Sequence, residues 1–268
     1  MRRTQKVLLR QHGVDGSRRV PDEVIVEEPL EIRLDGEQVS TTMRTPGNDF
    51  DLAVGFLHAE GLLDGAKVTG VRYCGTGSAV ATEFNVVTVE TDGRGPGPTP
   101  RLGPVGSACG VCGADQIVEL AGRLRPLDSV PELGAAGLVE ALNALGDLQD
   151  LHGRTGGSHA AALVDPAGQI ELIREDIGRH NAVDKVVGAL RLGGRLADVA
   201  QMGSAALFVT SRASFEMVQK AWAAGIGSVV AAGAPSALAI DTAQTAGMNL
   251  IAFARGESFN VYAGSVGT

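Results

Sequence analysis

The chain has 268 residues, of which 44% are hydrophobic and 20% charged, and this is the composition of a globular protein with one large domain or two smaller ones. No apolar run reaches the roughly eighteen residues of a transmembrane helix, and the basic N-terminus precedes too short an apolar stretch for a signal peptide, so we expect a cytoplasmic protein without a membrane partner. A formal net charge of −8 argues against broad nucleic-acid binding, which needs a surface that neutralises phosphates.

The first 90 residues predict an N-terminal domain of the mixed α+β type. Asp35-Gly36 is a hairpin turn signal between two alternating segments. A helix is expected to begin at Asn48 or Asp49 and to end near Gly61, because apolar residues recur between them at helical spacing. The expected strands cover residues 23–26, 30–34, 68–74 and 83–89.

Residues 91–113 are predicted to form a flexible linker and a cysteine loop. Glycine and proline punctuate positions 91–106, a pattern that favours an exposed, irregular segment. A short amphipathic helix is expected over 117–124, and a second glycine-rich break over 153–157. Residues 114–268 therefore comprise a helical connection and the C-terminal domain.

The C-terminal domain is predicted to be α/β, because apolar strands alternate with helices. The expected order is strand 205–210, helix 215–224, strand 228–232, helix 236–246 and strand 249–253. Such alternation implies a parallel sheet with helices on its faces, and ligands of such sheets bind beyond the carboxyl ends of the strands. Those ends carry hydroxyls, small residues and two arginines, at 210–212, 233–236 and 253–258. They suit a phosphate-bearing ligand, although ordinary strand-to-helix turns are an equal alternative.

Two further polar segments allow two interpretations each. Asp176, His180 and Asp184 would share one face of a helix, either toward a ligand or as a solvated face with internal ion pairs. His159 begins an expected strand at 160–164 and could bind a ligand or satisfy a backbone group.

Cys109 and Cys112 form the most reactive motif of the chain, in a glycine-rich C-G-V-C-G loop. A thiol attacks as its thiolate, and a helix beginning just after Cys112 would favour that negative charge. Such a pair can carry sulfur as a persulfide, by the logic of thiol-disulfide exchange. Half of a zinc site, a thioredoxin-like redox pair and an inert pair are the alternatives, and the third cysteine, Cys74, is expected in the core.

A zinc-dependent deaminase is a competing enzyme class. His58-Ala59-Glu60 matches H-x-E, and the cysteine pair matches C-x-x-C, which together describe a zinc-activated water with a glutamate proton shuttle. The match is imperfect, because Ala108 replaces the proline expected before the first cysteine. A histidine and a glutamate at the end of a structural helix are the simpler interpretation.

An ordered set of motifs along nearly the whole chain resembles one known family, the formate dehydrogenase accessory sulfurtransferases, or FdhD proteins. The matching segments are Glu28-Pro29-Leu30, Met43-Arg44-Thr45-Pro46, Leu52 to Leu57 with Glu60-Gly61, the C-G-V-C-G loop, T-G-G-S-H at 155–159, R-E-D-I-G-R-H-N-A at 174–182 and S-R-A-S-F-E at 211–216. No single motif would decide the matter, but this order is hard to obtain by chance.

The resemblance implies a function and a set of partners. Such proteins take sulfur from a cysteine desulfurase and pass it to the molybdenum bis(molybdopterin guanine dinucleotide) cofactor, which activates formate dehydrogenase. It also implies a cytidine-deaminase-like three-layer α/β C-terminal domain without zinc chemistry or a metal site of its own, and we expect a homodimer. By the same resemblance Cys109 carries the persulfide beside Cys112. The implied cofactor-binding residues are Phe253, Ala254, Arg255, Gly256, Glu257 and Ser258. A non-catalytic chaperone that holds the cofactor or the apo-enzyme is the alternative.

Overall fold

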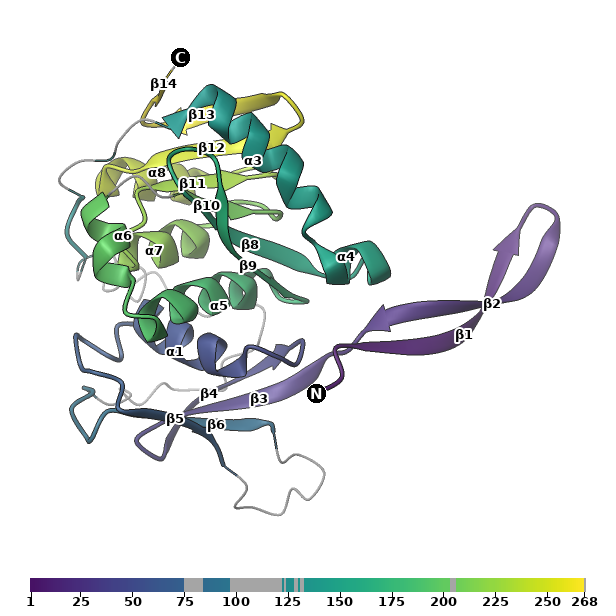
Figure 1. Cartoon of the computed structure of the whole chain (residues 1–268), viewed down its shortest axis with the longest axis horizontal. Coiled ribbons are helices and arrows are strands. Elements are labelled where there is room, and N and C mark those ends of the chain that lie inside the picture. The colour runs from purple at the N-terminus through teal and green to yellow at the C-terminus, as the bar shows by residue number, and fades with distance from the viewer. Residues whose placement is uncertain are drawn as a thin grey trace.

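The structure is a computed structural model, and it describes residues 1–74, 84–96, 122, 124–127, 130, 133–202 and 206–267. A small sheet with one helix packs against a larger helix-covered sheet, and a long hairpin extends away from both (Figure 1). Within these ranges no helix has the length and apolar character needed to span a membrane. The predicted domain boundaries at 90/91 and 113/114 stay predictions, because residues 97–121 lie outside the described part.

The hairpin consists of β1 (Thr4–Gly13) and β2 (Gly16–Ile25), which pair antiparallel along their whole length. It is joined to the body near its base, where the Arg154 guanidinium contacts the Glu23 carboxylate and donates a hydrogen bond of 2.9 Å to Thr4 Oγ1. Most of its side chains are exposed on both faces, so its sequence lacks the alternation that would have predicted the full strands.

The smaller module is a four-stranded sheet in the order β4-β3-β6-β5, covered by one helix. Its elements are β3 (Glu28–Leu34), β4 (Glu37–Arg44), α1 (Asp49–Ala59), β5 (Gly70–Tyr73) and β6 (Val86–Glu90). Asp35 and Gly36 both have positive φ, as the predicted tight hairpin turn requires. The predicted helix is confirmed, with Asn48 as its N-cap and acidic Asp49 and Asp51 in its first turn, where the helix dipole favours negative charge.

The larger module is built on a six-stranded sheet in the order β13-β12-β11-β10-β8-β9. Its strands are β8 (His159–Val164), β9 (Ile170–Asp176), β10 (Ala206–Val209), β11 (Ser228–Ala231), β12 (Asn249–Arg255) and β13 (Ser258–Ala263). The three predicted central strands β10, β11 and β12 are parallel, as expected. The sheet as a whole is mixed, because β8, β9 and β13 join antiparallel. A short parallel pair, β7 (Leu133–Gly134) with β14 (Val266–Gly267), lies beside it.

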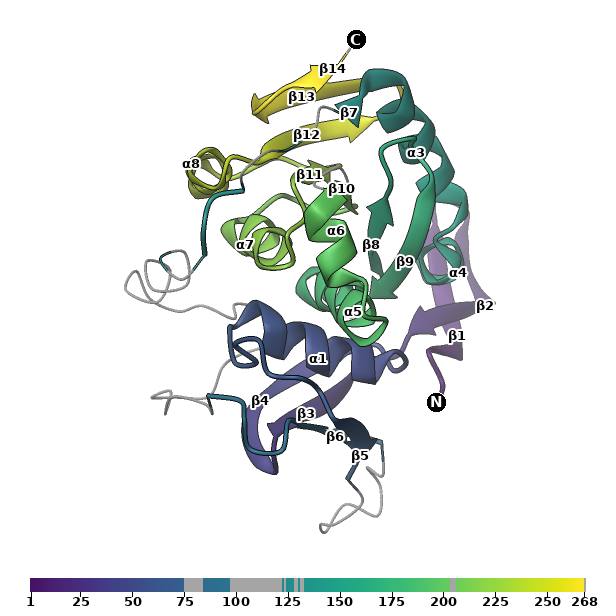
Figure 2. The ribbon, with the colours of Figure 1, turned by 60° about the vertical axis from the view of Figure 1, so that its left-hand side comes forward.

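Helices cover both faces of this sheet and give three layers (Figure 2). On β10, Leu207 and Val209 pack with α5 (Arg179–Leu192), α7 (Phe215–Ala223) and α8 (Ala237–Ala246). Ala206 and Phe208 face the other way and pack with α3 (Ala135–Asp147). Two short helices, α4 (Asp150–Thr155) and α6 (Leu196–Met202), complete the module. The predicted glycine break at 153–157 is wrong in its first half, because α4 runs through Gly153 and ends at Gly156, whose φ is +65°.

The two modules meet where α1 crosses α5, a contact that we call the α1–α5 seam. Gly55 and Gly188 make the crossing close, because a Cβ on either would lie 1.8 Å from a backbone oxygen of the other helix. Glycine is required at such a position since any side chain would force the helices apart. The seam therefore brings the backbones of the two modules into close contact.

Candidate functional site

The predicted catalytic residues Cys109 and Cys112 lie outside the described residues, and their roles stay predictions. Cys74, the third cysteine, follows β5 and is half-buried rather than fully enclosed in the core. Its Sγ lies 3.1 Å from Thr88 Oγ1 and accepts a hydrogen bond of 3.2 Å from Arg72. The Cys74 thiol is therefore held by neighbouring side chains of the smaller sheet.

The carboxyl ends of β10, β11 and β12 meet at one edge of the six-stranded sheet, which we call the strand-end edge. Backbone hydrogen bonds join the three predicted segments there. Gly233 donates to the Ser211 carbonyl at 3.0 Å, and Phe253 donates to the Gly233 carbonyl at 3.1 Å. Gly233 has no room for a side chain, because a Cβ would lie 3.0 Å from the Arg212 backbone. The segments 210–212, 233–236 and 253–258 therefore form one continuous surface, as topology predicted.

Phe253 has the least ordinary backbone at this edge. Its φ is +52°, in a region that non-glycine residues rarely adopt, and its ring is 44% exposed. The cause is a bulge between β12 and β13, where Phe253 and Ala254 interrupt the regular register. A bulge redirects a side chain, and strained backbone of this kind concentrates at functional sites. The outcome is an aromatic face held outward at the end of the strand.

The remaining predicted cofactor residues differ in what they offer a ligand. Arg255, Gly256, Glu257 and Ser258 are exposed in the hairpin between β12 and β13. The Arg255 Nε donates a hydrogen bond of 3.1 Å to the Ala232 carbonyl, which anchors the exposed side chain at this edge. Ala254 is 2% exposed and packs in the core beneath α3, so its side chain serves the fold.

His159 extends the strand-end edge toward β8. It is the first residue of that strand and pairs with Asp176 of β9, while the next amide, of Ala160, donates to Thr210 Oγ1 at 2.9 Å. Burial lowers the pKa of His159 below its ordinary value of 6.5, Arg179 lowers it further, and the Asp176 carboxylate opposes the shift.

Two polar atoms at the starts of α5 and α7 lie within segments that the family motifs contain, but the motifs did not indicate whether these atoms are paired. The Arg179 Nε and the Ser214 Oγ are both buried, and neither has a hydrogen-bond partner among the described residues. Nearby, the His180 Nε2 contacts the Glu216 carboxylate, so the first turns of α5 and α7 lie side by side. No sequence signal distinguishes such unpaired groups, since pairing depends on neighbours from other elements.

The expectation of a single helical face with Asp176, His180 and Asp184 is wrong. Asp176 is the last residue of β9, and α5 begins only at Arg179. Both aspartates are buried in ion pairs: Asp176 Oδ2 lies 2.6 Å from Lys185 Nζ, and Asp184 Oδ1 lies 2.7 Å from Lys220 Nζ. Burial raises the pKa of Asp184 to about 6, against the opposing pull of Lys220. These groups are structural.

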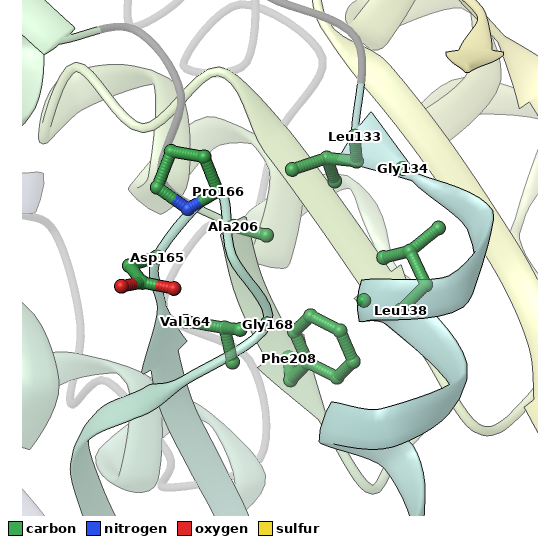
Figure 3. A pocket seen from close by; sticks show the side chains of 10 residues that line it. Leu133, Gly134, Leu138, Val164, Asp165, Pro166, Gly168, Ala206 and Phe208 are labelled. Atoms are coloured by element: carbon green, nitrogen blue, oxygen red, sulfur yellow. The ribbon is translucent and has the colours of Figure 1, made fainter. Parts of the chain in front are cut away.

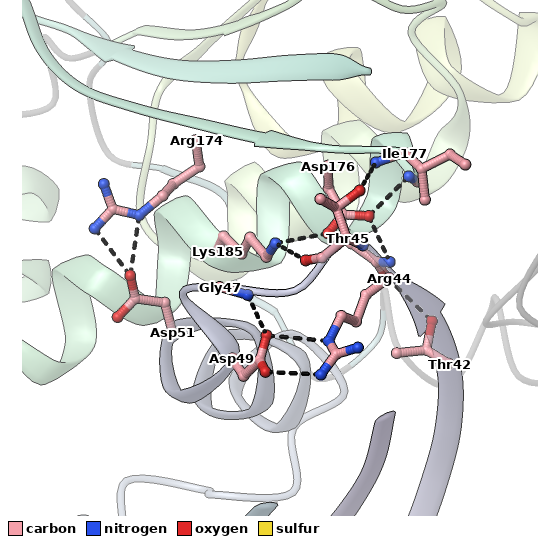
Figure 4. A network of polar contacts seen from close by, with 12 residues as sticks. Thr42, Arg44, Thr45, Gly47, Asp49, Asp51, Arg174, Asp176, Ile177 and Lys185 are labelled. Atoms are coloured by element: carbon pink, nitrogen blue, oxygen red, sulfur yellow. Dashed lines mark hydrogen bonds and ion pairs between the residues drawn. The ribbon is translucent and has the colours of Figure 1, made fainter. Parts of the chain in front are cut away.

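Figure 4 shows how such pairs connect the two modules at the seam. Arg44 is fully buried and binds Asp49 through both carboxylate oxygens, at 3.1 and 2.9 Å. Asp176 accepts from the Thr45 amide at 3.1 Å, and Lys185 donates to the Thr45 carbonyl at 2.9 Å. Arg44 and Asp49 thus pair within the smaller module, whereas Asp176 and Lys185 of the larger module are bonded across the seam to Thr45.

The zinc-deaminase residues have a structural explanation in the described part. A ring nitrogen of His58 lies 2.9 Å from the Ala223 carbonyl at the end of α7, and burial lowers the pKa of His58. Glu60 is buried close enough to affect the pKa of both Asp184 and Lys220. Among the described residues no three His, Cys, Asp or Glu side chains converge as metal ligands would.

A small pocket opens at the opposite end of the sheet (Figure 3). Leu133, Leu138, Val164 and Phe208 line most of it, and its one carboxylate, that of Asp165, accepts hydrogen bonds from the amides of its own turn at 2.9 and 2.8 Å. A lining of this kind offers no reactive group. The strand-end edge is therefore the better candidate site.

Comparisons with known proteins agree with each other. The family model of the FdhD/NarQ family matches residues 25–266. The chain is 46% identical to a protein named sulfur carrier protein FdhD from Anaeromyxobacter dehalogenans, over 97% of this chain and 91% of the relative. It is 42% identical to the protein of the same name from Corynebacterium efficiens, over 92% and 91%. A crystal structure described as a formate dehydrogenase accessory protein from Desulfotalea psychrophila shares the fold, with a TM-score of 0.79, 23% identity and 98% coverage of both chains.

Proposed function

The chain belongs to the FdhD/NarQ family, and from that premise we propose that it is a sulfur carrier that serves formate dehydrogenase. The observation that carries the proposal is the 46% identity, over nearly the whole chain, to a relative named as a sulfur carrier, in a sequence that holds a C-x-x-C pair. Its first partner would be a cysteine desulfurase. Its acceptor would be the molybdenum bis(molybdopterin guanine dinucleotide) cofactor, which is a substrate of the reaction.

The chemistry begins with loading. The Cys109 thiolate attacks the terminal sulfur of the desulfurase persulfide, the sulfur–sulfur bond of the donor breaks, and the donor cysteine leaves as a thiolate. Cys109 then holds the sulfur as a persulfide. No net oxidation occurs in this step, because one persulfide is exchanged for another.

Release of the sulfur needs two electrons, and the second cysteine can supply them. Cys112 attacks the Cys109 sulfur, a disulfide forms between the two cysteines, and the terminal sulfur leaves as hydrosulfide. Hydrosulfide replaces an oxygen ligand of the cofactor's metal, and that oxygen leaves as water with the two available protons. The disulfide must be reduced by a cellular dithiol before the next cycle.

The strand-end edge supports cofactor binding at Phe253 to Ser258. The exposed ring of Phe253 offers a face on which a guanine base can stack, since every base has a π-face. The terminal nitrogens of the exposed Arg255 side chain can bind phosphate oxygens in a bidentate manner. The three-layer arrangement also supports the proposed likeness to cytidine deaminases, and we include a cytoplasmic homodimer in the proposal.

Mass spectrometry after incubation with a cysteine desulfurase and cysteine tests the carrier function. A carrier gains one sulfur, about 32 Da, on the peptide that contains Cys109 and Cys112. The Cys109→Ala variant should show no gain, whereas Cys74→Ala, which removes the thiol of the smaller sheet, should load normally. A wild-type peptide without the added mass would instead indicate the non-catalytic chaperone.

A further inference from the structure

The β1–β2 hairpin reaches far beyond the part of the body that supports it (Figure 1). In the described part, the side-chain hydrogen bonds that join it to the body all lie at its base, where Arg154 binds Glu23 and Thr4. Every residue from 10 to 19 is exposed. A two-stranded hairpin without further support is only marginally stable in water. The outer part of the hairpin, residues 8–21, which we call the distal hairpin, therefore lacks a surface to pack against.

The distal hairpin carries charge opposite in sign to that of the whole chain. It contains three arginines, Arg10, Arg18 and Arg19, and one acidic residue, Asp15, whereas the formal net charge of the chain is −8. Arg18 donates a hydrogen bond of 3.0 Å to Gln11. Among the described residues, neither Arg10 nor Arg19 has a side-chain partner. A basic segment thus projects from an acidic protein.

The strand register brings the two unpaired arginines together, because Arg10 lies directly opposite Arg19. The Cβ atoms of directly opposite residues are about 4.5–5.5 Å apart, and like charges at such positions destabilise a strand pair. On the same face, two residues away along each strand, Leu8 lies opposite Pro21 and is 65% exposed. This face therefore combines two cations that repel each other with an apolar contact point.

An acidic protein surface matches this face better than a polyanion does. Each guanidinium can bind a carboxylate through two parallel hydrogen bonds, and a carboxylate between the two arginines would remove their repulsion. Nucleic acids and anionic membranes present negative charge over an extended surface, which the acidic body of this chain would repel. A protein can instead place a few carboxylates beside an apolar residue, where only the distal hairpin meets them.

The base of the hairpin indicates which protein this is. Gly157 packs against Ile25, since a Cβ on this glycine would lie 2.9 Å from Ile25 Cγ2. Arg154 and Gly157 shortly precede His159, where β8 begins at the strand-end edge. A protein that takes the cofactor from this edge would lie beside the hairpin, whose ten-residue strands span roughly 30 Å.

We propose that the distal hairpin is a docking arm that binds an acidic surface of cofactor-free formate dehydrogenase. Carboxylates of the enzyme would pair with Arg10 and Arg19, and an apolar residue beside them would cover Leu8. This inference rests on the proposed function, which makes formate dehydrogenase the protein that is served. It adds the surface through which the two proteins meet.

Biolayer interferometry of the full chain with purified, cofactor-free formate dehydrogenase tests the docking arm. The double variant Arg10→Glu/Arg19→Glu should raise the Kd about tenfold or more, and Leu8→Ser should raise it severalfold. Added salt should weaken wild type more than the double variant. The matched control Lys67→Glu/Arg94→Glu changes the net charge equally at two exposed cations of the smaller module and should keep the Kd within about twofold of wild type.

Unchanged affinity of Arg10→Glu/Arg19→Glu, or no binding of wild type to the enzyme, would overturn the docking arm. A shift from dimer to monomer in gel filtration of that variant alone would also overturn it, because a second copy would then be the occupant. Tighter binding of wild type to phosphatidylglycerol vesicles or single-stranded RNA than to the enzyme would likewise contradict it.

Sulfur loading is measured separately on the same proteins by mass spectrometry. The double variant should load sulfur like wild type, because the exposed hairpin holds neither cysteine of the proposed transfer. Failure of wild type to load sulfur would overturn the carrier proposal, while binding of the enzyme through Arg10 and Arg19 would still support the docking arm.

Discussion

Cationic side chains lie both at the α1–α5 seam and at the strand-end edge, but their surroundings differ. At the seam the buried side chains of Arg44 and Lys185 each have a carboxylate partner, Asp49 and Asp176. At the strand-end edge the Arg179 Nε has no partner among the described residues. Satisfied buried pairs hold a fold together, whereas an unsatisfied group is a place where a ligand can contribute its own interactions. The paired cations of the seam therefore stabilise the fold, whereas the unpaired group at the strand-end edge is open to a ligand.

The largest expected effect is the loss of a seam cation. Lys185→Met should lower the free energy of unfolding by about 3–5 kcal/mol, because it leaves the buried Asp176 carboxylate without its ammonium. Urea denaturation followed by circular dichroism measures the change. Lys67→Met, which removes an exposed lysine, should change the value by less than about 0.5 kcal/mol. Equal effects of the two variants would contradict the structural role of the pair.

The second effect concerns the helix crossing. Gly188→Ala should destabilise the protein by about 1–3 kcal/mol or more, because the new Cβ would collide with the Asp51 carbonyl and push α1 away from α5. Gly146→Ala, in α3, has open space around the new methyl group and should be neutral or stabilising by up to about 1 kcal/mol. A thermal unfolding series distinguishes them. A neutral Gly188→Ala would show that the seam is looser than described.

The third effect is a pH dependence of ligand binding at His159. In the free protein its pKa lies below 6.5, so its contribution to stability is present above 6.5 and is lost as pH falls through the lowered value. A bound anion favours the protonated ring, and pyrophosphate should therefore bind more tightly as pH falls below 6.5. Arg179, His152, His180 and Asp176 also act on this ring.

The His159→Gln variant isolates that contribution, since the titration of pyrophosphate itself is common to both proteins. The pyrophosphate affinity of this variant should change less with pH than the affinity of wild type. The two slopes should differ by less than about tenfold per pH unit, or 1.4 kcal/mol, because one titrating group can contribute no more. Isothermal titration at several pH values provides the comparison. Parallel pH profiles would exclude His159 from anion binding at the strand-end edge.

The smallest expected effect has the opposite sign. Arg179→Gln should raise the free energy of unfolding of the ligand-free protein by about 0.3–1 kcal/mol, because it removes a positive charge from the positive end of α5. Chemical denaturation without phosphate in the buffer detects this. Marked destabilisation would place Arg179 with the seam cations instead.

The regular C-terminal elements could be predicted because their signals are local. The strands β10, β11 and β12 are short apolar runs, and α8 begins at a serine cap and ends before Gly247, whose φ is +70°. The same topology correctly brought Phe253 to the ends of the other strands. In these cases neighbouring residues along the chain contain most of the information.

The parts that could not be predicted depend on residues far apart in sequence. Asp176 and His180 have helical spacing, but a strand ends and a helix begins between them, and only the pairing of β9 with β8 reveals it. The unpaired state of Arg179 and Ser214 is likewise a property of the assembled neighbourhood. Hairpin strand β1 went unrecognised because both of its faces are largely exposed. Sequence patterns therefore predicted which segments meet at the strand-end edge, but not how the side chains around them are paired.

Activation of formate dehydrogenase in cells that lack their own carrier tests the central claim most directly. Wild type and Cys74→Ala should restore enzyme activity, because the proposed transfer uses Cys109 and Cys112, whereas Cys74 contacts Thr88 within the smaller sheet. Cys109→Ala should restore none above background, although it should still bind pyrophosphate at the strand-end edge. Full activation by Cys109→Ala would contradict a sulfur carrier and favour a chaperone.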